Sequence, residues 1–225
     1  MCQNGICAGT PRECIDRDGN TYQTVKIGDQ CWMAENLRVT HYRNGDPIHN
    51  VTDSTAWINL TGGAYCEYDN DDDNVPVYGR LYNWYAVSDS RNIAPEGWHV
   101  PSDEEWKQLE MYLGMSQSEA DDTRYRGTDQ GGKLKATGTI EEGTGLWYAP
   151  NVGATNESGF SAVPGGARDG DDGNFINFSY QSPLWSSTEG GSSTAWSRGL
   201  SCLSARVCRN HIIKKHGFSV RCVRD

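Results

Sequence analysis

Two stretches of the 225-residue sequence concentrate carboxylates, the side chains that calcium prefers as ligands. These carboxylates are Glu67, Asp69, Asp71, Asp72 and Asp73 in the first stretch and Asp169, Asp171 and Asp172 in the second. Calcium takes about six to eight oxygen ligands in a flexible geometry. Neither stretch has the spacing of acidic residues that defines an EF-hand loop. Calcium binding is therefore one interpretation, and a solvated acidic loop is the simpler one.

The segment 196–217 mixes apolar, cationic and small polar side chains. Apolar residues together with Arg and His on an exposed surface suit recognition of another protein. We therefore predict that this segment forms a ligand-binding face. Its predicted contact residues are Ser197, Gly199, Ser201, Leu203, Ser204, Arg206, His211, Ile212, Ile213 and His216. The alternative is that Leu203 and Ile213 face the core and the others are ordinary surface. We expect Trp185, Trp196, Phe218, Val220 and Val223 in the core.

The cysteines and histidines do not form a recognisable catalytic pattern. The eight cysteines are Cys2, Cys7, Cys14, Cys31, Cys66, Cys202, Cys208 and Cys222, and none of them forms a CxxC pair. An even number of scattered cysteines favours an oxidising compartment and disulfides, whose connectivity the sequence leaves open. His41, His49 and His99 are isolated from one another. We therefore predict a protein that is not an enzyme and that needs no cofactor.

The overall charge and the apolar runs exclude two classes of partner. The formal net charge is −10, whereas binding to nucleic acid needs a basic face. No apolar run approaches the roughly 18–20 residues that span a bilayer. We expect neither nucleic-acid binding nor membrane insertion by this chain. Its polar first residues show no signal peptide, and we expect an export signal to have been removed.

The elements that must position these residues are short. Ser102 and Glu105 form a capping-box pattern, and the helix after them carries Trp106 and Leu109 on one face. The spacing of apolar residues over 81–87 predicts a second short helix. A hairpin with its turn at 18–20 is expected near the start, and two or three strands with turns near 209–210 and 215–217 near the end. Residues 1–15 are predicted to form a cysteine-rich arm, and 16–225 an α+β domain with two helices and small antiparallel sheets.

Ordered motifs along 16–225 identify a resemblance. They include DRDGNTYQTVKIGDQCWMAENL, YGRLYNWYAV, PEGWHVPSDEEW, NESGFSAVPGG, LWSSTE and GFSVRCVRD. The chain resembles the Fibrobacter succinogenes major paralogous domain family, which implies a C-type-lectin-like fold, related to that of formylglycine-generating enzymes, in exported or surface proteins. The sequence departs from the family pattern at Ile93, where many relatives carry a cysteine. Cys31 is an expected replacement partner for Cys222.

The C-terminal segment is also similar to that of variable proteins of diversity-generating retroelements. Those proteins share the implied fold and end in a diversified stretch before a constant tail. Randomising asparagine codons at their adenines yields NNC codons, and every residue of 201–208 and 211–213, as well as His216, has such a codon. The resemblance implies that this segment is diversified, and a template repeat beside the gene would test that hypothesis.

The relationship to formylglycine-generating enzymes raises a third interpretation. Those enzymes hold a copper-binding cysteine pair near the C-terminus, and Cys202 and Cys208 lie in a comparable region. Two thiolates could bind Cu(I). The spacing differs, and a structural disulfide or unrelated cysteines are the preferred explanations. The EPN, QPD and WND triplets of sugar-binding relatives are absent from the sequence, so calcium-mediated sugar binding has no support.

The sequence therefore predicts a secreted or surface-displayed, adhesin-like domain. Its ligand would be a protein or glycan on another cell, or on a phage or host surface. The alternative is a structural module that assembles a surface appendage through the same face.

Overall fold

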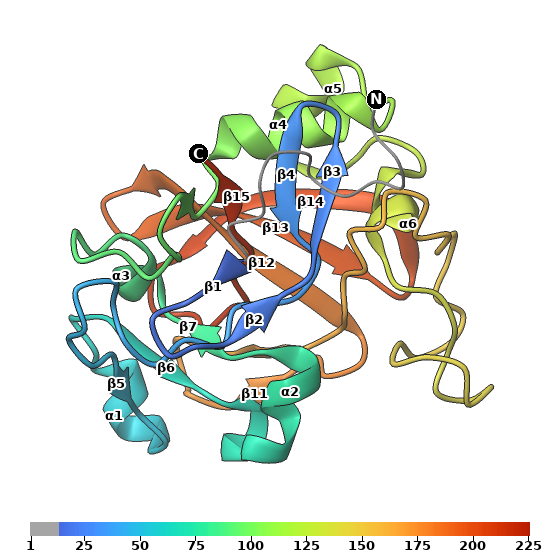
Figure 1. Cartoon of the computed structure of the whole chain (residues 1–225). Coiled ribbons are helices and arrows are strands. Elements are labelled where there is room, and N and C mark those ends of the chain that lie inside the picture. The colour runs from blue at the N-terminus through green and yellow to red at the C-terminus, as the bar shows by residue number, and fades with distance from the viewer. Residues whose placement is uncertain (1–13) are drawn as a thin grey trace.

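The computed structural model describes residues 14–225 and confirms an α+β fold of short helices and small antiparallel sheets (Figure 1). The prediction of two helices is too low. Besides α3 (Trp84–Val87) and α4 (Asp103–Tyr112), the described residues form α1 (Ser54–Ile58), α2 (Val75–Tyr78), α5 (Gln117–Asp121) and α6 (Gln130–Leu134). These four helices have only four or five residues each, so each offers little apolar periodicity within the helix itself. The equally short α3 was predicted because the apolar spacing extends beyond it, over 81–87.

The largest sheet is formed mainly by the C-terminal third of the chain. It has the order β12 (Gln181–Gly191), β13 (Thr194–Ser201), β14 (Ser204–Ile213) and β9 (Arg124–Arg126), and all its neighbours are antiparallel. Two-residue turns connect β12 to β13 and β13 to β14. The expected turn near 209–210 is wrong, because β14 runs through both residues. Segment 196–217 is thus mostly two long strands.

A second four-stranded sheet joins the two ends of the domain. Its order is β3 (Thr24–Ile27), β4 (Gln30–Met33), β15 (Val223–Arg224) and β8 (Trp98–His99). The expected turn at 18–20 connects β1 (Cys14–Ile15) to β2 (Thr21–Tyr22). The Asp16 carboxylate holds this turn by accepting hydrogen bonds from the backbone of Asp18 and Asn20. Cys14 and Ile15, which were assigned to the arm, therefore pair with the domain, and the rest of the arm lies outside the described residues.

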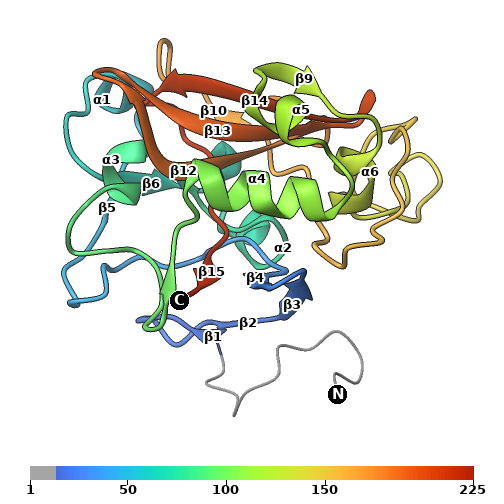
Figure 2. The ribbon, with the colours of Figure 1, turned by 90° about the horizontal axis from the view of Figure 1, so that it is seen from above.

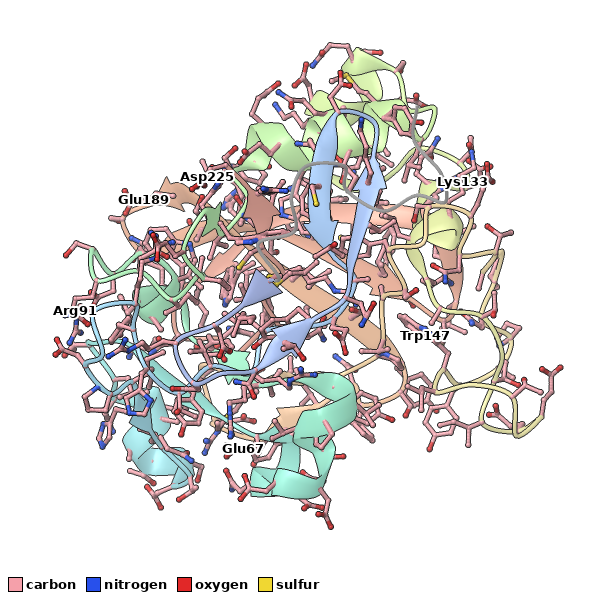
Figure 3. All side chains as sticks on the ribbon, viewed as in Figure 1. Glu67, Arg91, Lys133, Trp147, Glu189 and Asp225 are labelled. Carbon is pink, nitrogen blue, oxygen red and sulfur yellow. The ribbon has the colours of Figure 1, made fainter. Side chains whose placement is uncertain are left out.

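The remaining elements are small. A three-stranded sheet has the order β5 (His49–Asn50), β6 (Ala64–Cys66) and β7 (Leu81–Tyr82), and β10 (Ala167–Arg168) pairs with β11 (Phe175–Ile176). Two 3₁₀ turns, η1 (Tyr68–Asn70) and η2 (Asp72–Asn74), follow β6. Side chains fill the interior between these elements (Figure 3). None of the helices in residues 14–225 has the length and apolar character that crossing a bilayer requires.

Helix α4 lies between the large sheet and the β3–β4 hairpin (Figure 2). The predicted capping box is confirmed, since Ser102 and Glu105 satisfy each other's backbone N–H groups. On the hairpin side, the Trp106 ring lies 4.8 Å from that of Trp32. Of the five expected core residues, Trp185, Phe218, Val220 and Val223 are buried. Trp196 is only half-buried, and the Arg209 guanidinium lies 3.8 Å from its ring.

Buried cations satisfy the carbonyl groups of the many loops. A loop-rich interior leaves backbone oxygens without ladder partners, and each must find a donor or remain in water. Arg168 donates to Val51, Thr52 and Gly173, and Arg221 donates to Phe160 and Ser161. Lys135, which is 0% exposed, donates to Val152, Ser201 and Ser204. Loops from distant parts of the sequence are therefore held together without regular secondary structure.

Candidate functional site: a groove on the large sheet

The large sheet has two faces of different chemistry, because successive side chains of a strand point to opposite sides. Arg198 of β13 and Arg209 of β14 occupy paired positions on the face that contacts α4. Their neighbours Ser197, Gly199 and Cys208 belong to the opposite face, where Gly199 pairs with Cys208. The opposite face therefore carries small, uncharged residues at its centre.

This opposite face is hollowed by a groove of about 130 Å³, which we call the sheet groove. Its floor comes from β13 and β14, its walls from β9, β12 and the segment after β14. The residues that line it are Tyr125, Gln181, Pro183, Ser197, Arg198, Gly199, Leu200, Cys208, Asn210, Ile212 and Phe218. The side chain of Arg198 lies on the other face, so the groove presents uncharged side chains.

Three large exposed side chains come from the strands and turns of the large sheet, and one of them, Tyr125, lines the groove. Tyr125 is 47% exposed, Tyr180 46% and Leu203 67%. Tyr180 directly precedes groove residue Gln181, and its carbonyl accepts a hydrogen bond from the backbone N–H of Cys202, next to Leu203. Large exposed apolar side chains near a depression are typical of a binding surface.

The structure brings together part of the predicted contact set. Ser197, Gly199 and Ile212 line the sheet groove. Ser201 and Ser204 pair at the end of the β13–β14 hairpin, and Leu203 lies in its turn. Arg206 is exposed on β14 two residues before Cys208, so it belongs to the groove face.

The other three predicted contacts lie elsewhere. His211 is on the same face of the sheet as Arg209, away from the groove, with its ring 5.1 Å from that of Trp196. Ile213 lines a separate hollow with Lys214 and Lys215. His216 is half-buried against Phe218, and burial lowers its pKa. The strand alternation of β14 separates His211 from the groove, and the chain leaves the sheet after Ile213.

The prediction missed several groove residues. Cys208 and Asn210 share the two-residue period of Arg206 and Ile212, so strand alternation could have found them. Tyr125, Gln181 and Pro183 come from segments distant in sequence, for which no local signal exists.

Behind the groove, a buried charge network fixes the sheet to α4. Arg198 donates to Glu110 at 2.7 Å and to Asp103 at 2.8 Å, and Arg209 donates to Asp103 at 2.7 Å. Arg126 donates to Glu110 at 2.6 Å. Burial alone would raise the pKa of Asp103, but the hydrogen bonds from Arg209 and the charge of Arg198 outweigh it and lower the pKa to about 2. The network gives the groove a rigid support.

A histidine latch ties the end of the chain to the start of α4. His99 Nε2 lies 2.6 Å from Glu105 Oε1, and Nδ1 lies 2.6 Å from Asp225 Oδ1. The hydrogen bond with Glu105 raises the pKa of His99 to about 8, with a smaller contribution from Asp225. The imidazole is therefore protonated at neutral pH.

We expect this latch to make the protein less stable at high pH. A raised histidine pKa contributes stability that is complete below about pH 6.5 and is lost as the pH rises through about 8. Because 36% of the His99 side chain is exposed, we expect a loss of only about 1 kcal/mol. Urea unfolding at pH 6 and pH 9 would measure it, with His99→Gln as the control. An equal pH dependence in the variant would contradict a role for His99.

The cysteines do not form the expected pairs. Cys14, Cys66, Cys202, Cys208 and Cys222 are free thiols. Of the two preferred explanations for Cys202 and Cys208, a disulfide or unrelated cysteines, the disulfide is not formed. Cys202 is buried in the core cluster with Trp32 and Trp106, while Cys208 lines the groove. Cys222 is also free, so the expected replacement pairing with Cys31 is not formed. Burial raises the pKa of Cys208.

The acidic stretches form local turns. Glu67 is buried and forms an ion pair with Arg80. The carboxylates of Asp71, Asp169 and Asp172 accept hydrogen bonds from backbone N–H groups two residues ahead. Within residues 14–225, no group of three or more His, Cys, Asp or Glu side chains is placed to hold a metal ion.

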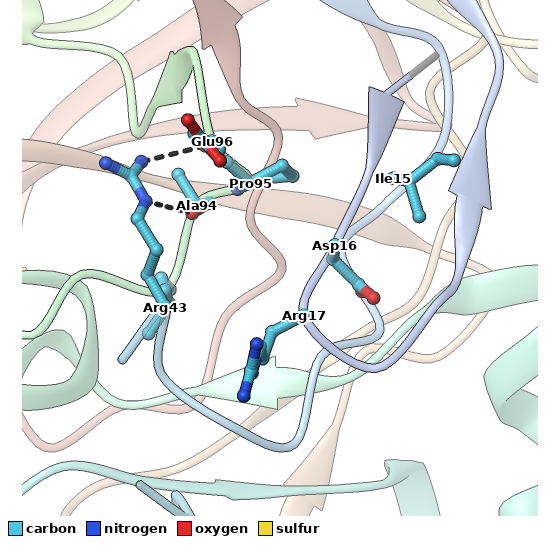
Figure 4. Close-up of a pocket in the computed structure, with 8 residues that line it drawn as sticks. Ile15, Asp16, Arg17, Arg43, Ala94, Pro95 and Glu96 are labelled. Carbon is cyan, nitrogen blue, oxygen red and sulfur yellow. Dashed lines mark hydrogen bonds between the residues drawn. The ribbon is translucent and has the colours of Figure 1, made fainter. Parts of the chain in front are cut away.

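A hollow of about 230 Å³ lies near the start of the described chain, close to β1 (Figure 4). Arg43 shapes it by donating hydrogen bonds to the carbonyls of Ala94 and Pro95 at 3.0 and 2.8 Å. Arg17 and Asp16 contribute to the other wall. None of the predicted contact residues lies here, so this hollow is separate from the sheet groove.

The comparisons with known proteins give a family. No curated protein matches the chain, and no solved structure does. The family model described as the Fibrobacter succinogenes major domain matches residues 25–224, which include the sheet groove and, except for Thr24, both four-stranded sheets. The chain therefore belongs to the Fibrobacter succinogenes major domain family.

Proposed function

We propose that this domain is a secreted or surface-displayed, adhesin-like receptor that binds its ligand in the sheet groove. The observation that carries the proposal is the groove itself, an uncharged hollow on a firmly held sheet that is lined by the exposed side chain of Tyr125. Tyr, Ser, Gly and Asn dominate the binding loops of antibodies, where Tyr supplies rigid contact area and the small polar residues adapt. Tyr125, Ser197, Gly199 and Asn210 give the groove a similar composition.

Surface complementarity would be the mechanism, without an enzymatic step. The scaffold, which we propose to be C-type-lectin-like, holds the backbone of β13 and β14 fixed. Side chains on the groove face can then change while those facing α4 stay the same. Diversification by a retroelement would act on this face through Ser204, Arg206, Cys208 and Ile212, which belong to it and have NNC codons. Cys202 and Val207 also have NNC codons but are buried in the core. A template repeat and reverse transcriptase near the gene would support that part of the proposal.

Filling the groove is expected to abolish ligand binding without unfolding the protein. A Cβ atom built on Gly199 lies 3.4 Å from Cβ of Cys208, which is ordinary contact, and the Gly199 backbone does not have a positive φ. Gly199→Leu should therefore fold and place its side chain in the groove, lowering affinity for the ligand by more than about tenfold, or about 1.4 kcal/mol. Gly199→Ala is the matched control and should bind nearly as the wild type does.

The measurement is binding of the labelled domain to intact cells and to the other proteins of its own surface assembly, with thermal unfolding of each variant in parallel. Saturable binding to foreign cells that Gly199→Leu removes supports the receptor role. Binding only to its own assembly partners would replace that role with the assembly module. Full binding by a folded Gly199→Leu variant would contradict the groove as the site.

A further inference from the structure

We propose that the sheet groove receives one aromatic side chain of a protein ligand, with a ligand carboxylate beside it that pairs with Arg206. This inference rests on the proposed binding role and names the chemistry of the ligand. It follows from the size of the groove, from the hydrogen bonds that its polar groups already make within the protein, and from the position of the exposed Arg206.

The size of the groove suits a single ring. Its volume is about 130 Å³. An apolar protein cavity of about 150 Å³ accommodates benzene, so the groove has room for one aromatic side chain and for little more. Pro183, Ile212 and Phe218 supply apolar contact, and Tyr125 stands at the edge where its ring can pack against a guest.

Several polar groups of the groove already have hydrogen-bond partners within the protein. The Ser197 hydroxyl donates to the Asn210 carbonyl at 3.1 Å, and the Asn210 amide donates to the Cys208 sulfur at 3.4 Å. The Gln181 side-chain oxygen accepts from Asn177 at 3.4 Å. A sugar brings several hydroxyls that lose water on binding and need new partners. The groove offers few such partners, so an apolar ring is the better guest.

The positive charge of Arg206 points to the second feature of the ligand, a carboxylate. Arg206 is exposed on the groove face of β14 and forms no ion pair within residues 14–225. In a chain of net charge −10, a cation without a carboxylate partner beside an uncharged groove is available to a ligand carboxylate. The guanidinium fork matches a carboxylate in two parallel hydrogen bonds. A phenylalanine-like group next to an acidic group therefore satisfies both parts of the surface.

The test is a titration of the domain, followed by NMR, with N-acetyl-L-phenylalanine, its uncharged amide, N-acetyl-L-alanine and methyl α-glucoside. We expect N-acetyl-L-phenylalanine to bind with a Kd of about 1–10 mM, the range of a weak fragment. Its amide should bind roughly threefold more weakly, because it lacks the carboxylate that meets an exposed arginine. The alanine and glucoside probes should not bind measurably.

Variants separate the two contacts. Gly199→Leu should remove binding of both phenylalanine probes, while Gly199→Ala keeps it. Arg206→Ala should make the acid and the amide bind equally. Lys26→Ala removes an exposed cation on β3, in the other four-stranded sheet, and should leave the preference for the acid unchanged.

A chemical block tests the groove without a substitution in its floor. Methyl methanethiosulfonate adds a methylthio group to a thiol and releases methanesulfinate, and Cys208 is the one free thiol of residues 14–225 that is not buried. Wild type treated in this way should lose binding of N-acetyl-L-phenylalanine, whereas treated Cys208→Ser should keep it.

The outcomes distinguish this inference from the proposed function. Binding of methyl α-glucoside that Gly199→Leu removes would overturn the aromatic guest and leave the groove as a binding site. An acid–amide preference unchanged in Arg206→Ala would overturn the carboxylate contact. Binding of the probes that neither Gly199→Leu nor the thiol block affects would overturn the inference entirely. The cell-binding experiment with Gly199→Leu decides the proposed function independently.

Discussion

Replacing Glu110 with alanine is expected to lower the free energy of unfolding by about 3–5 kcal/mol. Glu110 is 0% exposed, and its two carboxylate oxygens accept hydrogen bonds from Arg126 at 2.6 Å and Arg198 at 2.7 Å. Removing the carboxylate leaves two guanidinium groups buried with one negative charge fewer. Breaking a buried pair in this way destabilises far more than the net contribution of the intact pair, because the remaining charge has lost its water and its partner.

Urea unfolding at neutral pH measures this loss, and Glu104→Ala is the matched control. Glu104 lies on the same helix, but its side chain is 60% exposed and its nearest cationic partner is Lys107 at 3.5 Å. An exposed pair contributes about 0–1 kcal/mol, so Glu104→Ala should change stability little. Equal effects of the two substitutions would show that the network does not hold the sheet on α4.

The same network shows where sequence reasoning succeeds and where it fails. The start of α4 is local information, since Ser102 and Glu105 are three residues apart, and it was predicted correctly. The burial of Glu110 depends on Arg198, 88 residues further along the chain. A helical pattern would place such a carboxylate in solvent, because no residue near it in the sequence indicates its partner.

The groove residues likewise fall into those that a local sequence pattern predicts and those that it does not. The alternating residues of a strand are local, and segment 196–217 therefore yielded Ser197, Gly199 and Ile212. The prediction of a turn near 209–210 failed because two polar residues in sequence resemble a turn. Arg209 is instead held in the strand by Asp103 and by the ring of Trp196. Tyr125 joins the groove only because β9 pairs with β14, a contact that no local pattern encodes.

Replacing Lys135 with methionine is expected to lower the free energy of unfolding by about 2–3 kcal/mol and to loosen the β13–β14 turn. The Lys135 ammonium donates hydrogen bonds to the carbonyls of Val152, Ser201 and Ser204 at 2.8–3.0 Å. Methionine keeps most of the apolar stem but leaves three carbonyls without this donor. Burial lowers the pKa of Lys135 to about 8, so desolvation of the charge offsets part of what these hydrogen bonds contribute.

Lys133→Met is the matched control, because Lys133 lies only two residues earlier, inside α6, whereas Lys135 directly follows the last residue of that helix. The Lys133 side chain is 21% exposed, donates to a single carbonyl, that of Leu113, and pairs with Asp129 at 3.3 Å. It should lower the free energy of unfolding by about 1 kcal/mol or less. Amide hydrogen exchange supplies a second measurement. In Lys135→Met, faster exchange should be concentrated around Leu203, because the carbonyls of Ser201 and Ser204 on either side of the turn lose a shared donor. If exchange around Leu203 is unchanged while global stability falls, Lys135 stabilises the core without ordering the turn. If it rises as expected, the buried lysine that holds the loops also fixes the end of the hairpin that carries the groove.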